Sequence, residues 1–173
     1  VIVSLIEIEC DNLPVLNLTK NKTQRNNIVL ADYFDKNISV SEVKSSVITD
    51  GVISNDVVYQ DGKIDCSAVL FGGECSLILT TDKVKCSIPV FVWTDAIEDV
   101  AGLKSLQTIE NGYYYLTSDI DMSATEWVDN GDGVFKGVLD GKDLDGKINV
   151  INNFNASCGL FNSLGNGAEI RNI

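Results

Sequence analysis

The chain has 173 residues, enough for one large domain or two small ones. It carries 25 Asp and Glu against 13 Lys and Arg, for a formal net charge of −12, and it has no histidine. So few cations argue against nucleic-acid partners, which need phosphate neutralisation, and against anionic membrane surfaces. Without histidine, nucleophiles activated by a histidine base are excluded.

The first half of the chain predicts a series of short strands. The first apolar run, which begins at Val1, is too short to span a bilayer, so no membrane insertion is expected. Asp61-Gly62 is the strongest hairpin signal, because it separates two alternating runs by two turn residues. The predicted strands are Val1–Glu9, Val15–Leu18, Ile28–Ala31, Ile38–Val43, Val57–Gln60, Lys63–Leu70, Cys75–Thr80 and Val84–Val92. So many short strands in so few residues favour a β-sandwich over residues 1–92.

Three segments of this half resemble a bacterial immunoglobulin-like (BIG-type) domain of the kind strung along surface proteins. They are the glycine hairpin Asp61-Gly62-Lys63-Ile64, the glycine-rich turn from Gly72 to Leu77, and the closing run from Val84 to Val92. The Cys-Trp-Cys signature of antibody domains is missing, since Trp93 follows the last predicted strand. The resemblance therefore implies the sandwich class, with this domain acting as a spacer.

A short helix is predicted after the junction at Trp93-Thr94. Asp95 and Glu98 match a capping box, with Asp95 as the N-cap. Ile97, Val100, Leu103 and Leu106 then share one side of the helix. The segment could be an ordinary linker helix between two domains or a cap on the structure that follows.

The last third of the chain contains weak internal echoes. The segment from Gly159 to Leu164 is similar to that from Gly133 to Val138, and Ile170-Arg171-Asn172 is similar to Ile151-Asn152-Asn153. Short apolar runs broken by Gly and Asn are typical of a β-solenoid, in which these residues occupy corners of positive φ. One coil cannot bury its own apolar face, so each coil must stack on a neighbour.

The same stretch contains several motifs in a fixed order: Tyr113-Tyr-Tyr-Leu-Thr-Ser-Asp-Ile-Asp-Met-Ser123, then Trp127, then Phe135-Lys-Gly-Val-Leu-Asp-Gly141, then Ala168-Glu-Ile-Arg-Asn-Ile173. In these motifs it resembles the opening coils of right-handed β-helix surface proteins, the pectin-lyase-like solenoids and adhesins with GLUG-type repeats. The resemblance implies an all-β chain with a capping helix and the first coils of a β-helix over residues 93–173. The segment from Asp140 to Gly146 departs from the shorter turn of that family.

Acidic pairs are the remaining candidates for chemistry, since two carboxylates suffice for glycoside hydrolysis. Asp119 with Asp121 and Asp129 with Asp132 are such pairs, although Asp in Gly- and Asn-rich loops usually serves the turn. We expect no catalytic residue and no cofactor. Weak metal candidates are Asp140, Asp143 and Asp145, whose oxygens suit Ca²⁺.

Aromatic side chains are weak ligand-binding candidates, because their rings could stack on sugars. The two chosen are Tyr114 and Trp127. Strand alternation would expose either Tyr114 or the pair Tyr113 and Tyr115, but not all three.

Five cysteines leave at least one without an internal partner. Most of them lie in apolar, alternating runs, where a thiol acts as a small hydrophobe. Buried thiols and one disulfide among the first four both remain open. The cysteines are Cys10, Cys66, Cys75, Cys86 and Cys158.

Together these features predict a non-catalytic structural or adhesion module of a large bacterial cell-surface or phage-virion protein, in an extracellular setting. The alternative is the N-terminal part of a β-helix polysaccharide lyase or glycoside hydrolase. The expected partners are other domains of the same long chain or identical copies, meeting at the open β-helix edge beside Ile173. A glycan or a host surface protein is a further expected partner.

Overall fold

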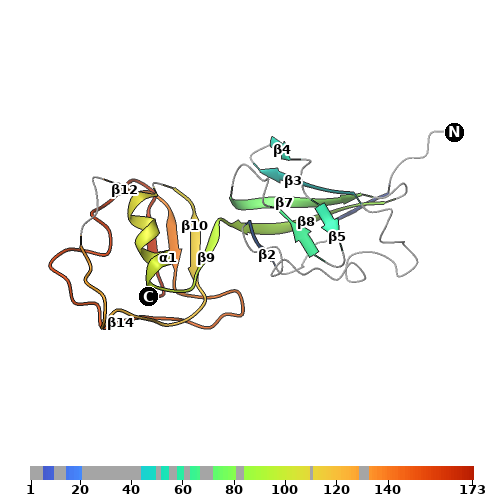
Figure 1. Ribbon diagram of the computed structural model, residues 1–173. Helices are drawn as coiled ribbons and strands as arrows, with labels where there is room; N and C mark the ends of the chain where they lie inside the picture. The colour runs from blue at the N-terminus through green and yellow to red at the C-terminus, as the bar shows by residue number, and fades with distance from the viewer. Residues whose placement is uncertain are drawn as a thin grey trace. The chain divides into compact units, whose positions relative to one another are not determined.

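The computed structural model describes residues 6–9, 15–20, 44–49, 52–54, 58–60, 63–66, 72–80, 84–109, 111–128 and 133–173. These residues form a mostly β structure with one short α-helix (Figure 1). The chain divides into two compact units, Val1–Trp93 and Thr94–Ile173, which are taken in turn.

Unit 1 is built on a sheet whose centre is the antiparallel pair β7 (Gly73–Thr80) and β8 (Val84–Trp93). On one side, β7 pairs antiparallel with β3 (Lys44–Thr49), which pairs with β4 (Val52–Ser54). On the other side, β1 (Ile6–Glu9) and β2 (Leu16–Thr19) both run parallel to β8, at different halves of its length. Buried side chains alternate along β8 at Ile88, Val90 and Val92. Elsewhere in the sheet adjacent residues are buried together, as at Leu18 with Thr19, Leu77 with Ile78 and Val92 with Trp93.

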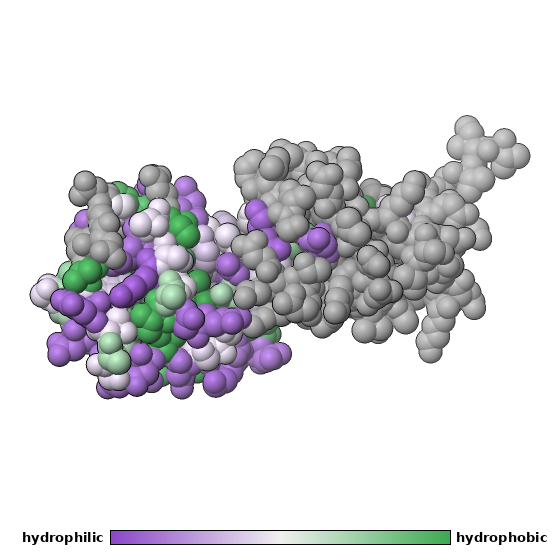
Figure 2. All heavy atoms as spheres, in the orientation of Figure 1, coloured by the Kyte–Doolittle hydropathy of each residue, from purple (hydrophilic) through white to green (hydrophobic). Residues whose placement is uncertain are grey.

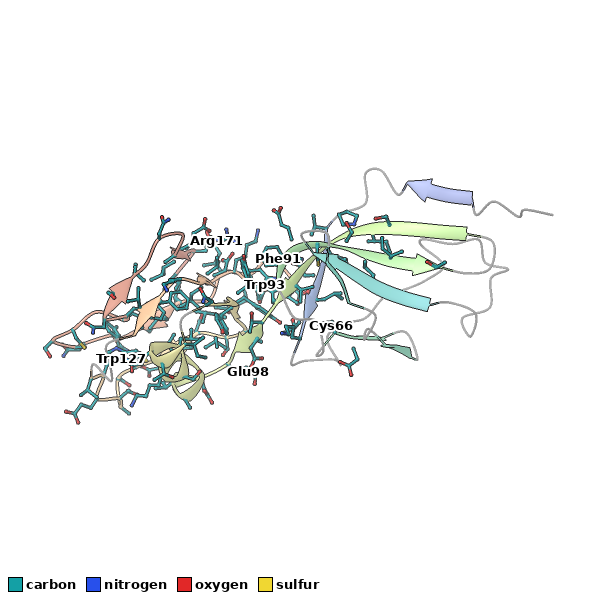
Figure 3. All side chains as sticks on the ribbon, turned by 90° about the horizontal axis from the view of Figure 1, so that it is seen from above. Cys66, Phe91, Trp93, Glu98, Trp127 and Arg171 are labelled. Carbon is teal, nitrogen blue, oxygen red and sulfur yellow. The ribbon has the colours of Figure 1, made fainter. Side chains whose placement is uncertain are left out.

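The end of β8 is fixed to β2 by a side-chain contact. Trp93 Nε1 donates a hydrogen bond to Asn17 Oδ1 at 3.0 Å, and the Trp93 ring lies 4.7 Å from that of Phe91 (Figure 3). Trp93 therefore belongs to the last strand of unit 1 instead of following it, and its indole N–H has the partner that a buried Trp needs.

The predicted hairpin at Asp61-Gly62 is confirmed by the strands on either side of it. β5 (Val58–Gln60) and β6 (Lys63–Asp65) pair antiparallel, with Gln60 opposite Lys63. The strands β3 and β4 were not predicted, because their polar residues weaken the apolar alternation. The predicted strands Ile28–Ala31 and Ile38–Val43 lie outside the described residues.

The described residues of unit 2 form eight short strands, and the pairings between these strands are all parallel. Its largest sheet has the order β16–β13–β10–β9, formed by Glu169–Arg171, Val138–Asp140, Tyr113–Leu116 and Asp95–Ile97. β11 (Ile120–Asp121) pairs with β14 (Ile151–Asn152), and β12 (Val134–Phe135) pairs with β15 (Ser163–Leu164).

These pairings follow the order of the chain. We call β10, β11 and β12 the first pass and β13, β14 and β15 the second pass. Each strand of the first pass has the corresponding strand of the second pass as its parallel neighbour, and β16 adds to β13 where a third pass begins. Short strands far apart in sequence are thus held side by side, as Figure 1 shows for β10 and the strands around it.

The predicted start of the helix at Asp95 is wrong. Asp95 to Ile97 form β9, and the helix α1 (Val100–Ser105) begins after Asp99, whose carboxylate accepts a hydrogen bond from the Gly102 N–H at 2.8 Å. The helix starts later because Ile97 is part of the sheet, where its carbonyl accepts a hydrogen bond from the Thr117 N–H at 3.0 Å. A 3₁₀ turn, Leu106–Thr108, continues the helix.

The core of unit 2 lies between the sheets and α1. Leu103 and Leu106 from the helical segment pack with Tyr114, Leu116 and Leu139 from the large sheet. Its other buried members are Ile97, Ile120, Met122, Trp127 and Phe135. The ring of Phe135 stacks on that of Phe161 with centroids 4.3 Å apart, so the first sequence echo joins two residues that meet in space.

Leu139 is fully buried at the centre of this core, and truncating it should be costly. We expect Leu139→Ala to lower the free energy of unfolding of unit 2 by about 2–5 kcal/mol, through lost burial and the cavity left behind. Urea unfolding followed by the NMR signals of unit 2 measures this, because tryptophan fluorescence would also report on Trp93 of unit 1. The control Ile148→Ala, at a side chain that is 57% exposed, should change it by less than about 0.5 kcal/mol. Equal effects for the two variants would contradict this core.

Candidate functional site

Asp140 ends β13 and is 6% exposed, the most deeply buried acid of the described residues. Its Oδ1 accepts hydrogen bonds from the Lys142 N–H and from Asn172 Nδ2, both at 2.9 Å. Its Oδ2 accepts one from Arg171 Nε at 2.7 Å. Arg171 is labelled in Figure 3; its Nη1 also contacts Glu169 Oε2 at 2.9 Å. The carboxylate is therefore satisfied by groups of this chain.

The segment after Asp140 forms a small closed loop. Lys142 and Ile148 form an antiparallel bridge, and Gly146 turns the chain at φ +89°. Asp143 Oδ1 accepts from the N–H groups of Asp145 and Lys147, at 3.0 and 2.9 Å. This carboxylate stabilises the turn, as the competing interpretation of these acids predicts.

The three weak metal candidates do not converge. Asp140 accepts hydrogen bonds from Arg171 and Asn172, and Asp143 accepts from the turn of its own loop. Asp145 is exposed. Within the part of the chain that the structure describes, no three His, Cys, Asp or Glu side chains are grouped so that they could hold a metal ion. Asp129 and Asp132 lie outside that part.

The pair Asp119 and Asp121 is likewise hydrogen-bonded to the chain. Asp119 Oδ1 accepts from the Val150 N–H at 3.0 Å. Asp121 Oδ1 accepts from the Ser123 N–H at 2.9 Å and from Asn153 Nδ2 at 2.8 Å. Both acids of the first pass therefore bind residues of the second.

Asp121 and Asp140 are the centres of two matching corners, which we call the Asp–Asn corners. In each, Asp Oδ1 accepts from the backbone N–H two residues on and from the side-chain amide of an Asn 32 residues on, namely Asn153 or Asn172. Both asparagines have φ 55°, a left-handed conformation that Asn tolerates better than most residues.

The two Asp–Asn corners also match in their backbone hydrogen bonds. The N–H that follows each Asp donates to the carbonyl that precedes each Asn: Met122 to Asn152 and Gly141 to Arg171, both at 2.9 Å. The corners explain the second sequence echo, in which Ile-x-Asn occurs at Ile151 and again at Ile170. The role of Asp121 and Asp140 as the matching partners of these asparagines was not predicted. The available signal was that Ile120-Asp121 and Leu139-Asp140 have the same spacing as the two Ile-x-Asn segments.

The corners favour charged carboxylates. The hydrogen bond from Asn153, then those from the N–H and Oγ of Ser123, lower the pKa of Asp121 below its ordinary value of 3.8. Burial raises the pKa of Asp140, but hydrogen bonds from Asn172, the Lys142 N–H and Arg171, with the Arg171 charge, outweigh it, and the net pKa is lowered.

Both ligand-binding candidates are buried. Tyr114 is 4% exposed, and its hydroxyl donates to the Asn111 carbonyl at 3.2 Å. Trp127 is also 4% exposed; its Nε1 donates to the Gly159 carbonyl at 3.2 Å (Figure 3). Such burial leaves little ring surface for stacking on a sugar. Tyr115 on the opposite face of β10 is buried as well, so the sheet does not follow simple one-sided alternation there.

The described cysteines lie in apolar surroundings. Cys66 is fully buried and Cys75 is partly buried. Cys158 is a free thiol whose Sγ lies 3.8 Å from the Trp127 carbonyl oxygen. Cys10 and the side chain of Cys86 are outside the described residues, so the predicted choice between thiols and a disulfide stays open.

The edge of unit 2 at β16 exposes apolar side chains that are in register with core residues. Ile170 lies beside Leu139 yet is 39% exposed, and Leu164 lies beside Phe135 yet is 54% exposed. Ile173 is 41% exposed. On the face of unit 2 drawn in Figure 2, apolar areas lie among hydrophilic side chains. The β16 edge is therefore the candidate interaction surface of this unit.

Comparisons of the chain with protein-family models, with curated proteins and with solved structures found no match. Among the described residues no helix has the length and apolar character needed to cross a membrane.

The Asp–Asn corner at Asp140 can be tested by truncating its asparagine. Asn172→Gly keeps the left-handed backbone but removes a hydrogen bond to a charged acceptor, so we expect a loss of about 1.5–3 kcal/mol of unfolding free energy. Asn172→Ala should cost about 1 kcal/mol more, because alanine disfavours positive φ. Urea unfolding measures both. Asn155→Ala, on an exposed loop, is the matched control; if it costs as much as Asn172→Gly, the corner has no special role.

Acid should lower the stability of unit 2 by protonating Asp140. The folded-state pKa of Asp140 lies below 3.8, so folding favours its charged form. Its stabilising contribution is thus present above about pH 4 and is lost as the pH falls through the folded-state pKa. Thermal melts between neutral pH and pH 2 should show a smaller acid loss for Asp140→Asn than for the wild type. The exposed control Asp145→Asn should follow the wild type, and an identical acid loss in all three proteins would refute the assignment.

Proposed function

We propose that unit 2 forms the opening coils of a right-handed β-helix. Each proposed coil corresponds to one pass, and the support is that three successive strands of the first pass find their parallel neighbours in the second in the same order. The helix α1 serves as the cap, because Leu103 and Leu106 cover apolar core that an end coil would otherwise expose. The corners then fix one coil on the next.

For unit 1 we propose an immunoglobulin-like sandwich that acts as a spacer. The support is that the antiparallel centre β7–β8 and the hairpin β5–β6 belong to separate sheets, which a sandwich would pack face to face. An apolar core at Leu18, Leu77 and Ile88 supports a unit that is stable in its own right.

We infer that the chain is a non-catalytic structural or adhesion module of a large bacterial cell-surface or phage-virion protein. The observation that carries this proposal is the use of Asp119, Asp121, Asp140 and Asp143 as acceptors for backbone and Asn groups. A general acid or base must be able to exchange its proton with a substrate, and these carboxylates are committed to holding turns. Such a module contributes length, rigidity and a surface for a glycan or a host protein.

The proposal is tested by asking whether the protein cleaves polysaccharide. Incubated with pectate, alginate or hyaluronate, with and without Ca²⁺, it should release no reducing ends or unsaturated products. It should remain folded in the same samples, as judged by circular dichroism. Formation of either product would contradict the non-catalytic assignment. Its loss in an Asp140→Asn variant that stays folded, with activity kept in Asp145→Asn, would favour a β-helix lyase or hydrolase that acts through Asp140.

A further inference from the structure

The connection between β15 and β16 is longer than the matching connection of the first pass. Two residues join β12 to β13, but four join their partner strands β15 and β16. The first and last of the four stay beside the first pass. The Gly165 N–H donates to the Phe135 carbonyl at 2.8 Å, and the residue after the connection, Glu169, donates its N–H to the Gly137 carbonyl at 3.0 Å. The two middle residues are therefore extra to the parallel ladder.

These two residues, Asn166 and Gly167, form the exposed tip of a turn. The Ala168 N–H donates to the Gly165 carbonyl at 3.2 Å and closes the turn at its base. Gly167 has φ +85°, and apart from its chain neighbours no atom lies within 4 Å of the place where a side chain would begin. Because the tip is extra to the ladder, a further coil stacked on β15 and β16 would pair with those strands and not with the tip.

An asparagine that precedes a glycine can react with its own backbone. The peptide nitrogen of the glycine attacks the side-chain carbonyl carbon of the asparagine, so that a C–N bond forms, and the side-chain nitrogen leaves as ammonia with the proton that the peptide nitrogen gives up. Water then opens the cyclic succinimide at either of its carbonyls, which yields aspartate or isoaspartate. Glycine favours the attack because it has no Cβ beside the nitrogen and leaves the backbone free to rotate.

We propose that Asn166 is a site of spontaneous deamidation, through a succinimide formed with the backbone nitrogen of Gly167. The attack requires the tip to change its conformation, and the open space around Gly167 allows this. The reaction consumes only water. Each event replaces a neutral amide with a carboxylate, and the isoaspartate product adds a carbon atom to the backbone between β15 and β16. The inference goes beyond the proposed function and does not rest on it.

A second Asn-Gly pair, Asn111-Gly112 before β10, gives a comparison within the same chain. Gly112 is enclosed: a side chain there would begin 2.5 Å from the Tyr114 hydroxyl, and its carbonyl accepts from the Val138 N–H at 2.8 Å. The Asn111 carbonyl accepts from the Tyr114 hydroxyl at 3.2 Å. The same dipeptide is thus held by its neighbours before β10 and is unhindered at the tip, so the fold should select Asn166.

The rates of deamidation at the two pairs test this selection. The folded protein is incubated at mildly alkaline pH, and peptides that contain residue 111 or 166 are quantified over time by mass spectrometry, with isoaspartate identified by electron-transfer fragmentation. We expect the native rate at Asn166 to be at least about tenfold higher than at Asn111. In urea the two rates should become similar, because the contacts around Gly112 are lost. Equal rates in the native protein, or a faster reaction at Asn111, would overturn the proposal.

A substitution at the attacking residue tests the route. Gly167→Ala should slow the loss of the Asn166 amide at least about tenfold, because the new Cβ hinders the nitrogen. Gly146→Ala is the matched control, since Gly146 also has positive φ in an exposed turn but does not follow an asparagine; the rate at Asn166 should stay that of the wild type. Circular dichroism checks that both variants are folded. An unchanged rate in Gly167→Ala would rule out the succinimide at this site.

Discussion

The fold of unit 2 depends on the carboxylates of Asp121 and Asp140. Each accepts a hydrogen bond from an asparagine of the next pass. The strands of unit 2 are two to four residues long, too short to specify a sheet by their own ladders. The strand pairing is specified instead by two hydrogen-bonded pairs, Asp121 with Asn153 and Asp140 with Asn172. Each pair fixes an asparagine in the left-handed conformation and sets the register between passes. As a result Ile120 is paired with Ile151, and Leu139 with Ile170. That register aligns the buried side chains of Ile120 and Leu139 with apolar residues of the next pass.

The same constraint limits what these acids can do. A carboxylate that accepts three hydrogen bonds, as Asp140 does from Lys142, Asn172 and Arg171, is stabilised in its charged form and held in one position. Its lowered pKa is the opposite of what a general acid near neutral pH requires. The acids that suggested chemistry in the sequence are therefore better understood as turn and corner residues, which is the physical basis for proposing a structural or adhesive module.

Much of the strand content could be predicted from the sequence, because alternation and turn residues are local signals. The hairpin at Asp61-Gly62 and strands close to β2, β5, β7 and β8 are examples. The helix start failed because β9 takes Asp95 to Ile97 into a parallel sheet, a tertiary demand that capping propensity does not contain. The asparagine echo could be read from the sequence, and Asp121 and Asp140 have the same spacing, but their contacts with these asparagines could not be predicted, since a contact across 32 residues depends on the stacking itself. Burial of both Tyr114 and Tyr115 was hidden for the same reason.

The most direct test of this account is amide hydrogen exchange at the two corners, measured by NMR in the native protein. The N–H groups of Met122 and Gly141 should exchange as slowly as amides in the centre of β10 and β13, because each donates to a carbonyl of the next pass. Asn153→Gly should accelerate exchange at Met122, and Asn172→Gly should accelerate it at Gly141. If both amides exchange as fast as those of the exposed loop around Gly146, the Asp–Asn corners do not hold the passes together.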